Sequence, residues 1–451
     1  MDDYNAAFMW KQEPEAEKLA LDLLQTACDK HSGLKEFDRA LHRLTSTRLF
    51  DWVDHIATKD FPETRVALEQ CGYEEEGTFS KVVSFRHPRA QLPTIVLGEH
   101  EGVAVAVDSI SDFLMVRGLK REIDGSLFSP YRRCLVDEED GIAFWVVERR
   151  GTRTMEASYP AEDYLNDYLT AKEIWKTRTR LSLDIEKEMD EAIKMAGDLS
   201  AMMGRDLAAW IVLEVEREYW QARNTAGHIQ KGRQDRLGVG WANHDHHTFR
   251  SSRKNFCKLV ELFKILGFTC RERFYAGVEA GWGAQVMENA NAGLVLFLDV
   301  DLAPDEVAVD FAHQTLPGED ELGTIGLWCE LHGDSILKAG MHHLELQFNF
   351  DDLKRDLDSL GVGMMDPFSN FPYLKQAFTQ GEMWPVERFR VDALLSQKLI
   401  TGDQAKQFLE QGAVGSHMEN LQRRHGYKGF NQKNVSNIIK RTDPRTITSN
   451  Q

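Results

Sequence analysis

An internal repeat constrains the fold of this chain more than any other feature of the sequence. Three segments share one plan, and they begin at Asp54, Asp245 and His342. Each has a histidine on a short alternating stretch, then a helical pattern of about three turns, then a glycine before the next apolar stretch. Two or three further β-type runs follow the first two copies. The chain therefore uses one supersecondary unit repeatedly.

The order strand, helix and three strands resembles the βαβββ module of the vicinal oxygen chelate superfamily. Two such modules pair their sheets into a cup, so the resemblance implies an α+β fold with a cupped mixed sheet, a helical insert and a helical C-terminal region. The predicted regions are an N-terminal helical segment (1–49), a first module (50–150), a helical insert with a basic loop (151–240), a second module (241–335), a partial third repeat (336–364) and a C-terminal helical region (365–451).

The repeat also places candidate metal ligands. His55 and His246 occupy equivalent positions in the first two copies, and each follows an aspartate. Side chains alternate between the two faces of a strand, so both imidazoles are expected to point into a shared cup. Glu330, in the predicted last strand of the second module, would complete the set. Two imidazoles and one carboxylate on one face are typical of a non-haem Fe(II) site with open positions.

Other residues compete for these roles. Glu148 ends the first module as Glu330 ends the second, and Glu288 and Glu345 also lie in β-type runs. His244 and His246 would share one face of a strand and could form a local site, whereas His247 would point the other way. A lone histidine on a strand is more often a hydrogen-bonded structural residue than a ligand. The role of the third histidine copy, His342 and His343, stays open.

Two short motifs resemble those of the 2-oxoadipate dioxygenase/decarboxylases, also called hydroxyglutarate synthases. They are DHIATK from Asp54, followed by Cys71-Gly72-Tyr73, and DHHTFR from Asp245. The resemblance implies Fe(II) held by two histidines and a glutamate, a small 2-oxo carboxylic acid as substrate, and O₂ as the oxidant. The family's third ligand would fall on Glu330. Its carboxylate-binding arginine would be Arg250, with Lys59 at the corresponding place in the first copy.

Some side chains around the predicted site have an ordinary structural alternative. Gln285 could donate a hydrogen bond to the bound acid, or it could be a structural amide. Trp282 and Phe274 would exclude water from the site, but core packing explains them equally well. A basic stretch before the second copy could attract an anionic substrate or simply be a solvated linker; it contains Lys231, Arg233 and Arg236.

The composition of the chain disfavours several kinds of partner. The formal net charge of −18 makes nucleic acid and anionic membranes poor partners. The six cysteines are widely spaced with no CxxC pair, which indicates reduced core residues. The acidic N-terminal sequence is unlike a secretion signal, so we expect a cytoplasmic protein.

A ring-cleaving dioxygenase, a glyoxalase-type isomerase and a non-enzymatic binding protein built from repeats are the alternatives to a 2-oxo acid dioxygenase.

Overall fold

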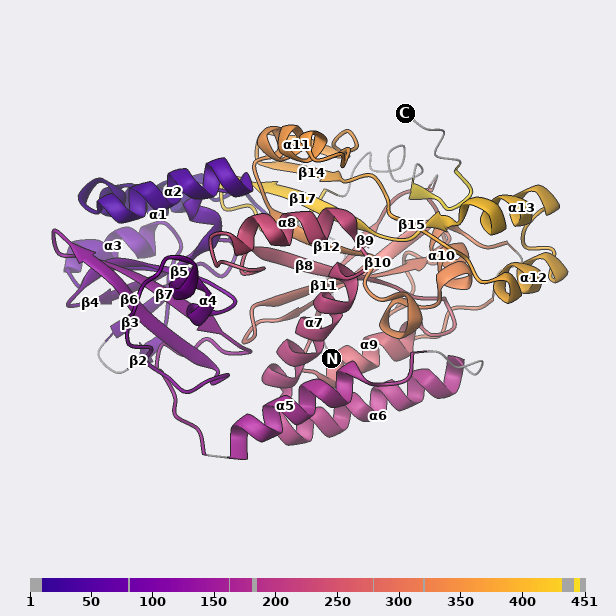
Figure 1. The fold of residues 1–451 in the computed structure, drawn as a ribbon, viewed down its shortest axis with the longest axis horizontal. Coiled ribbons are helices and arrows are strands. Elements are labelled where there is room, and N and C mark those ends of the chain that lie inside the picture. The colour runs from indigo at the N-terminus through magenta and orange to yellow at the C-terminus, as the bar shows by residue number, and fades with distance from the viewer. Residues whose placement is uncertain are drawn as a thin grey trace.

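The computed structural model describes residues 10–79, 82–161, 163–180, 185–278, 280–318, 321–431 and 442–446. Its two large sheets are mixed and curled, and they lie next to each other in the molecule (Figure 1). Each sheet consists of two modules joined by an antiparallel pair of central strands. The predicted α+β class with paired βαβββ modules is confirmed.

The first sheet has the strand order β2-β3-β4-β1-β5-β7-β6. One module runs from β1 to β4 and the other from β5 to β7, with β1 and β5 antiparallel at the centre. The elements are β1 (Val53–Lys59), α3 (Pro62–Gln70), β2 (Glu74–Phe79), β3 (Val82–Arg86), β4 (Thr94–Gly98), β5 (Glu101–Ala106), α4 (Ile110–Val116), β6 (Tyr131–Glu139) and β7 (Ile142–Arg149). The second module has one strand fewer than the first.

The second sheet has the strand order β13-β14-β17-β12-β8-β11-β10-β9. One module starts at β8 and the other at β12, and these two strands pair antiparallel at the centre. The elements are β8 (His244–Arg250), α9 (Phe256–Ile265), β9 (Thr269–Tyr275), β10 (Trp282–Asn289), β11 (Leu294–Asp301), β12 (His343–Gln347), α11 (Phe350–Ser359), β13 (Ser369–Phe371), β14 (Leu374–Phe378) and β17 (His417–Arg423). This sheet carries the candidate site.

The remaining helices surround the two sheets. They are α1 (Pro14–Lys30), α2 (Ser32–Thr45), η1 (Leu49–Trp52), α5 (Asp163–Lys176), α6 (Ile185–Met203), α7 (Arg205–Gln221), α8 (Thr225–Asp235), α10 (Thr324–His332), η2 (Ser335–Ala339), α12 (Arg388–Ser396) and α13 (Gly402–Gln411). A small pair, β15 (Met383–Trp384) and β16 (Ala413–Val414), flanks α12 and α13. Among the described residues, no helix combines the length and apolar character that crossing a membrane would require.

The pairing predicted between regions 50–150 and 241–335 is wrong. The strands of the first region already form a complete sheet from two modules of their own. The second region pairs instead with the third histidine repeat, because β12 of that repeat lies antiparallel to β8. The third repeat is thus not a fragment, since strands from the C-terminal region complete it as a full module.

The C-terminal region 365–451, expected to be helical, contains the strands β13, β14 and β17 as well as α12 and α13. The sequence conceals these strands because polar side chains such as Gln376, His417 and Glu419 are buried in them. An alternation of apolar and polar residues is the usual sign of a strand, and burying polar groups removes it. Residues 432–441 and 447–451 of this region lie outside the described residues.

The segment TIGLWCELHG, predicted to be the last strand of the second module, forms helix α10. Its run of apolar residues is buried on nearly all sides, so periodicity alone could not separate a strand from a helix. The carboxylate of Asp301 accepts hydrogen bonds from the backbone N–H groups of Ile325 and Gly326 at the start of the helix. An anionic group at a helix N-terminus stabilises the helix.

The basic stretch predicted as a loop before the second copy is also helical. Lys231 and Arg233 lie within α8, and Arg236 follows its last residue. The side chain of Asn224 caps the first turn of this helix by accepting a hydrogen bond from the backbone N–H of Gly227. Arg233 forms an ion pair with Asp356, so its charge is used in packing.

Two apolar cores stabilise the two sheets. One lies between the first sheet and the helices α1, α2, α3 and α4. The larger one lies between the second sheet and α5, α6, α7, α9 and α11. Leu344 and Leu346 of β12 and Leu296 and Leu298 of β11 belong to the larger core. The intervening residues of these strands therefore face the opposite side of the sheet, which we call the site face.

Glu148, the rival candidate ligand, has a structural role. Its buried carboxylate accepts hydrogen bonds from Arg132, Arg150 and the backbone N–H of Ile110. We expect Glu148→Ala to lower the free energy of unfolding by about 3–5 kcal/mol, because it leaves two buried guanidinium groups without their partner. Chemical unfolding measures this loss. Glu330→Ala is the control, expected to change stability by less than about 0.5 kcal/mol because Glu330 is exposed; equal effects of the two variants would contradict this role.

Candidate metal centre

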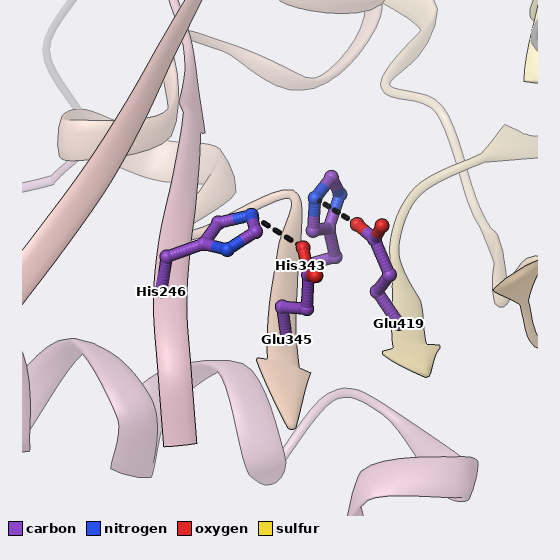
Figure 2. Close-up of side chains that lie close together, drawn as sticks. All are labelled: His246, His343, Glu345 and Glu419. Atoms are coloured by element: carbon purple, nitrogen blue, oxygen red, sulfur yellow. Dashed lines mark ion pairs between the residues drawn. The ribbon is translucent and has the colours of Figure 1, made fainter. Parts of the chain in front are cut away.

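Four ionisable side chains meet on the site face of the second sheet: His246, His343, Glu345 and Glu419 (Figure 2). One nitrogen or oxygen atom from each lies within 4.8 Å of those from the other three. The four residues come from the adjacent strands β8, β12 and β17, and all are buried. Strands far apart in the sequence therefore bring together four side chains that could bind a metal. We call His246, His343, Glu345 and Glu419 the donor set.

Strand register explains this convergence. Glu345 of β12 lies directly opposite His246 of β8 on one side and beside Glu419 of β17 on the other. His343 precedes Glu345 by two residues and so shares its face. The pattern HLELQ thus sends two leucines into the helix-covered core and two ionisable residues toward the site face.

The electrostatics of the group fit a divalent cation. His246 Nε2 lies 2.5 Å from Glu345 Oε2, and His343 Nε2 lies 2.8 Å from Glu419 Oε2. Burial raises the pKa of both carboxyl groups and lowers the pKa of both imidazoles. The carboxyl group of Glu345 also lies against that of Glu419, and the proximity of the two acids raises the pKa of Glu345 further. Burial thus disfavours the charged forms of all four groups, and a bound cation would offset this cost by interacting with their converging nitrogen and oxygen atoms.

Neighbouring side chains orient the donor atoms. His246 Nδ1 donates to Asp245 Oδ1 at 3.1 Å, which leaves Nε2 facing the group. Asp245 in turn accepts hydrogen bonds from the guanidinium of Arg423 and the amide of Gln347. Gln376 Nε2 donates to Glu419 Oε1 at 3.2 Å. Carboxylate and amide partners of this kind fix the orientation of metal-ligating side chains.

Aromatic residues close the site. The rings of Phe297 and Phe430 lie 4.7 Å and 5.1 Å from the His246 ring, and Phe378 lies 5.2 Å from His343. Phe274 and Trp282, proposed from the sequence as apolar walls, belong to the same cluster. A cavity of about 310 Å³ lies between the two sheets, and none of the four candidate ligands lines it. Aromatic side chains therefore pack against both histidines of the donor set.

Arg250 lies on the site face of β8, four residues after His246. It is 2% exposed, and its guanidinium lies over the ring of Trp328 at 5.4 Å. Asp299 of β11 is its register partner and is 3% exposed. Burial raises the pKa of Asp299 to about 7 and lowers the pKa of Arg250 to about 10. The site face thus carries a buried guanidinium group, that of Arg250, and a buried carboxyl group, that of Asp299, in addition to the donor set.

Of the three predicted ligands, the structure places only His246 in the group. His55 lies on β1 of the first sheet and is not among the side chains whose donor atoms lie close to those of His246. His55 instead pairs with Asp54, its Nδ1 lying 2.7 Å from Asp54 Oδ2. Glu330 is exposed on α10 and lies on none of the strands that form the group. The predicted set of His55, His246 and Glu330 is therefore wrong as a single site.

Of the three predicted catalytic residues, one lies on the site face of the second sheet and two lie elsewhere. Lys59 lies on β1 of the first sheet, half exposed, with Glu101 at 3.5 Å. Gln285 is buried, but it pairs in register with Leu298 and so faces the helix-covered core, where its amide donates to two backbone carbonyls. Neither Lys59 nor Gln285 lies beside the donor set. Among the predicted catalytic residues, Arg250 lies on the same face of the second sheet as the donor set.

The local pair of His244 and His246 does not form a site either. His244 Nδ1 contacts the backbone carbonyl of Trp241, and a β-bulge separates His244 from the regular pairing of β8 with β12. His247 faces the core side, where its Nε2 contacts Arg217. The histidine-rich stretch therefore contributes one candidate ligand.

The two sheets are related position by position, which explains the misleading repeat. His55 corresponds to His246, and the aspartate before each accepts hydrogen bonds from an arginine of the last strand, Arg149 or Arg423. The strand register also relates the other three members of the donor set to positions in the first sheet. Gly102 corresponds to His343, Ala104 to Glu345, and Trp145 to Glu419. The first sheet keeps the Asp-His-Arg arrangement but has no further donor at those positions.

Glu419 was missed in the sequence because its strand was interpreted as helix. His343 and Glu345 were visible as polar residues at a spacing of two in an otherwise apolar strand. The signal that could have found Glu419 is the arginine four residues later, because Arg149 ends β7 in the same way. The correspondence between Arg149 and Arg423 identifies β17 as the last strand of a module.

Comparisons with known proteins give weak similarities. No family model matches the chain, and no curated protein matches it. A triple mutant of 4-hydroxymandelate synthase from Streptomyces coelicolor aligns over 87% of this chain and 98% of its own, with 13% identity and a TM-score of 0.29. Methylmalonyl-CoA epimerase from Mycobacterium tuberculosis aligns over 40% and 87%, with 13% identity and a TM-score of 0.23. Such scores carry no argument about function.

The strand order decides the classification of the fold. Both sheets consist of paired modules whose first and last strands are parallel neighbours, with the first strands of the two modules antiparallel at the centre. The chain has a vicinal oxygen chelate fold. The donor set lies where the two modules of the second sheet meet.

The raised pKa of Asp299 predicts a pH-dependent stability. Its pKa is 3.8 in an ordinary setting and about 7 here, so folding favours the protonated acid. The associated stability is present below about pH 4 and is lost as the pH rises to about 7. In metal-free protein, we expect the stability of Asp299→Asn relative to wild type to increase by roughly 2–3 kcal/mol between pH 5 and pH 8. Denaturant unfolding at both pH values measures this, and a pH-independent difference would contradict it.

Proposed function

We propose that this protein is a non-haem Fe(II)-dependent dioxygenase that decarboxylates and oxidises a small 2-oxo carboxylic acid. One observation carries the proposal: two imidazoles, His246 and His343, and the carboxylate of Glu419 project from neighbouring strands toward one another among buried aromatic side chains. Two histidines and one carboxylate on one face are the ligand set of non-haem Fe(II) oxygenases, and this set leaves positions open for substrate and O₂.

The donor chemistry agrees with this ion. Imidazole nitrogens and a carboxylate oxygen suit Fe(II), and the outer contacts from Asp245 and Gln376 hold two of these donors in place. When bound, Fe(II) supplies the electrons that activate O₂ for oxidative decarboxylation of a 2-oxo acid. No cysteine lies among the four grouped residues, so the set does not resemble a structural zinc site rich in thiolates.

The protein's own residues would position the substrate and keep water out. Arg250 offers a planar guanidinium that matches a carboxylate through two parallel hydrogen bonds. Phe297, Phe378 and Phe430 surround the histidines and lower the local dielectric, which strengthens electrostatic contacts in the site. Glu345 holds a carboxyl group beside His246, where it either completes the coordination or retains a proton.

Glu345 is also the specific observation that favours a second candidate function. With Glu345 as a ligand, the set becomes two histidines and two carboxylates, which leaves fewer open positions for substrate and O₂. Such a site suits a metal-dependent isomerase of the glyoxalase type, in which a carboxylate moves a proton on a chelated substrate. The metal bound and the consumption of O₂ separate this candidate from the dioxygenase.

Metal content tests the donor set. We expect the purified protein to bind about one Fe(II) per chain. His343→Ala and Glu419→Ala should each weaken this binding by more than about 100-fold, because replacing even an outer-shell partner costs 10–100-fold. His55→Ala, the matched position in the first sheet, is the control and should keep full iron content. Metal analysis after anaerobic loading measures these values, and equal iron loss in His55→Ala would contradict the assignment.

Oxygen consumption tests the reaction. With Fe(II) and a panel of 2-oxo acids, we expect O₂ uptake and CO₂ release in equal amounts, and we expect both to be lost in Glu419→Ala. An oxygen electrode and a CO₂ assay measure the two gases. Tight binding of Zn²⁺ or Ni²⁺, with isomerisation of a substrate and no O₂ uptake, would support the isomerase instead.

A further inference from the structure

The cavity between the two sheets is lined by residues of both. Its volume is about 310 Å³, which is enough for a small organic molecule. Asp54 and Arg149 line it from the first sheet, and Asp245 and Arg423 line it from the second. Asp245 also accepts a hydrogen bond from His246 Nδ1. The cavity therefore reaches the side chain that orients one member of the donor set.

Carboxylates outnumber cations in the lining of this cavity. Six carboxylates and five guanidinium groups line it. Every one of these arginines has a carboxylate partner: Arg48 pairs with Asp51, Arg149 with Asp54, Arg423 with Asp245, and Arg86 and Arg153 with Glu76. Glu17 and Asp108 form no ion pair with a described residue, and Glu17 accepts a hydrogen bond from the backbone N–H of His425. The lining thus carries an excess of negative charge.

Asp108 is the carboxylate that a ligand in the cavity can use. It follows β5, and its Oδ2 accepts a hydrogen bond from the backbone N–H of Trp241 at 2.5 Å. Burial raises the pKa of Asp108 above its ordinary value, and the more distant cations Arg217 and Lys231 offset only part of this effect. Arg217 contacts His247 on the core side of β8 instead. The charge of Asp108 is therefore not neutralised by an ion pair with a described residue.

Two further hydrogen-bond acceptors line the same end of the cavity. His244 Nδ1 donates to the backbone carbonyl of Trp241, the residue whose N–H binds Asp108, so a neutral His244 offers Nε2 as an acceptor. The amide nitrogen of Gln347 donates to Asp245 at 2.8 Å, which leaves the side-chain oxygen of Gln347 as an acceptor. This end of the cavity therefore offers acceptors for a ligand that has several donors.

The other groups at this end leave room for a cation with a carbon chain. Arg423 already donates through Nε, Nη1 and Nη2 to Asp245 and to two backbone carbonyls. The ring centre of Trp210 lies 6.0 Å from that of His244, and Leu92 also lines the cavity. A primary ammonium group brings three donors and one positive charge. Its charge and donors match the carboxylate and the acceptors, and its carbon chain matches the apolar part of the lining.

We propose that this cavity binds a small organic ammonium ion and that its occupation strengthens metal binding at the donor set. The ammonium group would donate to Asp108, to His244 Nε2 and to the side-chain oxygen of Gln347. Gln347 would then be held where its amide nitrogen donates to Asp245, which in turn orients His246. The effect on metal binding rests on the proposed function, whereas the ammonium site does not.

Matched amines and alcohols test the ammonium site. Butylamine and 1-butanol have the same carbon chain, as do 2-phenylethylamine and 2-phenylethanol, but only the amines are charged at pH 7. Calorimetric titration of the metal-free protein gives the Kd of each compound. We expect at least one amine to bind at least about tenfold tighter than its alcohol, because hydrogen bonds to charged groups are the stronger ones. Equal binding within both pairs, or binding of neither amine, overturns the inference.

A substitution assigns the preference to the charge of Asp108. Asp108→Asn keeps the shape of the side chain and an oxygen that can accept from Trp241, but it removes the negative charge. We expect amine binding to weaken by at least about tenfold and alcohol binding to change by less than about threefold. Glu330→Gln is the control, because it removes a negative charge that does not line the cavity, and it should change neither Kd. Thermal unfolding confirms that both variants are folded, and a preference for the amine that survives in Asp108→Asn overturns the inference.

Metal titration tests the coupling between the cavity and the donor set. We expect saturating amine to tighten Mn²⁺ binding by at least about fivefold, and Mn²⁺ to tighten amine binding by the same factor, because coupling between two sites is reciprocal. The matched alcohol should leave the Kd of Mn²⁺ unchanged. An unchanged Kd with the amine overturns the coupling. A protein that binds neither Mn²⁺ nor Fe(II) overturns the proposed function and the coupling with it, while the titrations of metal-free protein still decide the ammonium site.

Discussion

The antiparallel pairing of β8 with β12 is the interaction on which the candidate site depends. Its register places Glu345 opposite His246, and the parallel pairing of β12 with β17 places Glu419 beside Glu345. A shift of one residue would turn His343 and Glu345 into the leucine-rich core and bring leucines to the site face. The apolar core beneath β12 therefore fixes the geometry of the donor set, because only one register keeps both faces satisfied.

Burial gives the site its chemical character. The enclosed carboxyl groups and imidazoles are driven toward their neutral forms, so the metal-free group stores unfavourable desolvation that a divalent ion relieves. On the same face, Nε and Nη1 of Arg250 and Oδ1 of Asp299 are also buried without a hydrogen-bond partner among the described residues.

The sequence predicts the module and one member of the candidate donor set, His246, but not how the modules assemble. The repeat shows that the βαβββ unit recurs, and the histidine of the second copy, His246, lies in the donor set. The repeat does not show which modules share a sheet. The module that pairs with the second copy is completed by strands β13, β14 and β17, and polar residues buried in these strands remove the alternation of apolar and polar residues that usually indicates a strand. The match between His55 and His246 is real, but it reflects a shared Asp-His-Arg arrangement that ties the first strand of one module to the last strand of its sister.

Anomalous diffraction at the iron edge, from crystals grown anaerobically with Fe(II), tests the central claim most directly. The account predicts one strong peak per chain, within coordination distance of His246, His343 and Glu419. A peak beside His55 in the first sheet, or no peak in a chain that is otherwise well ordered, would contradict it.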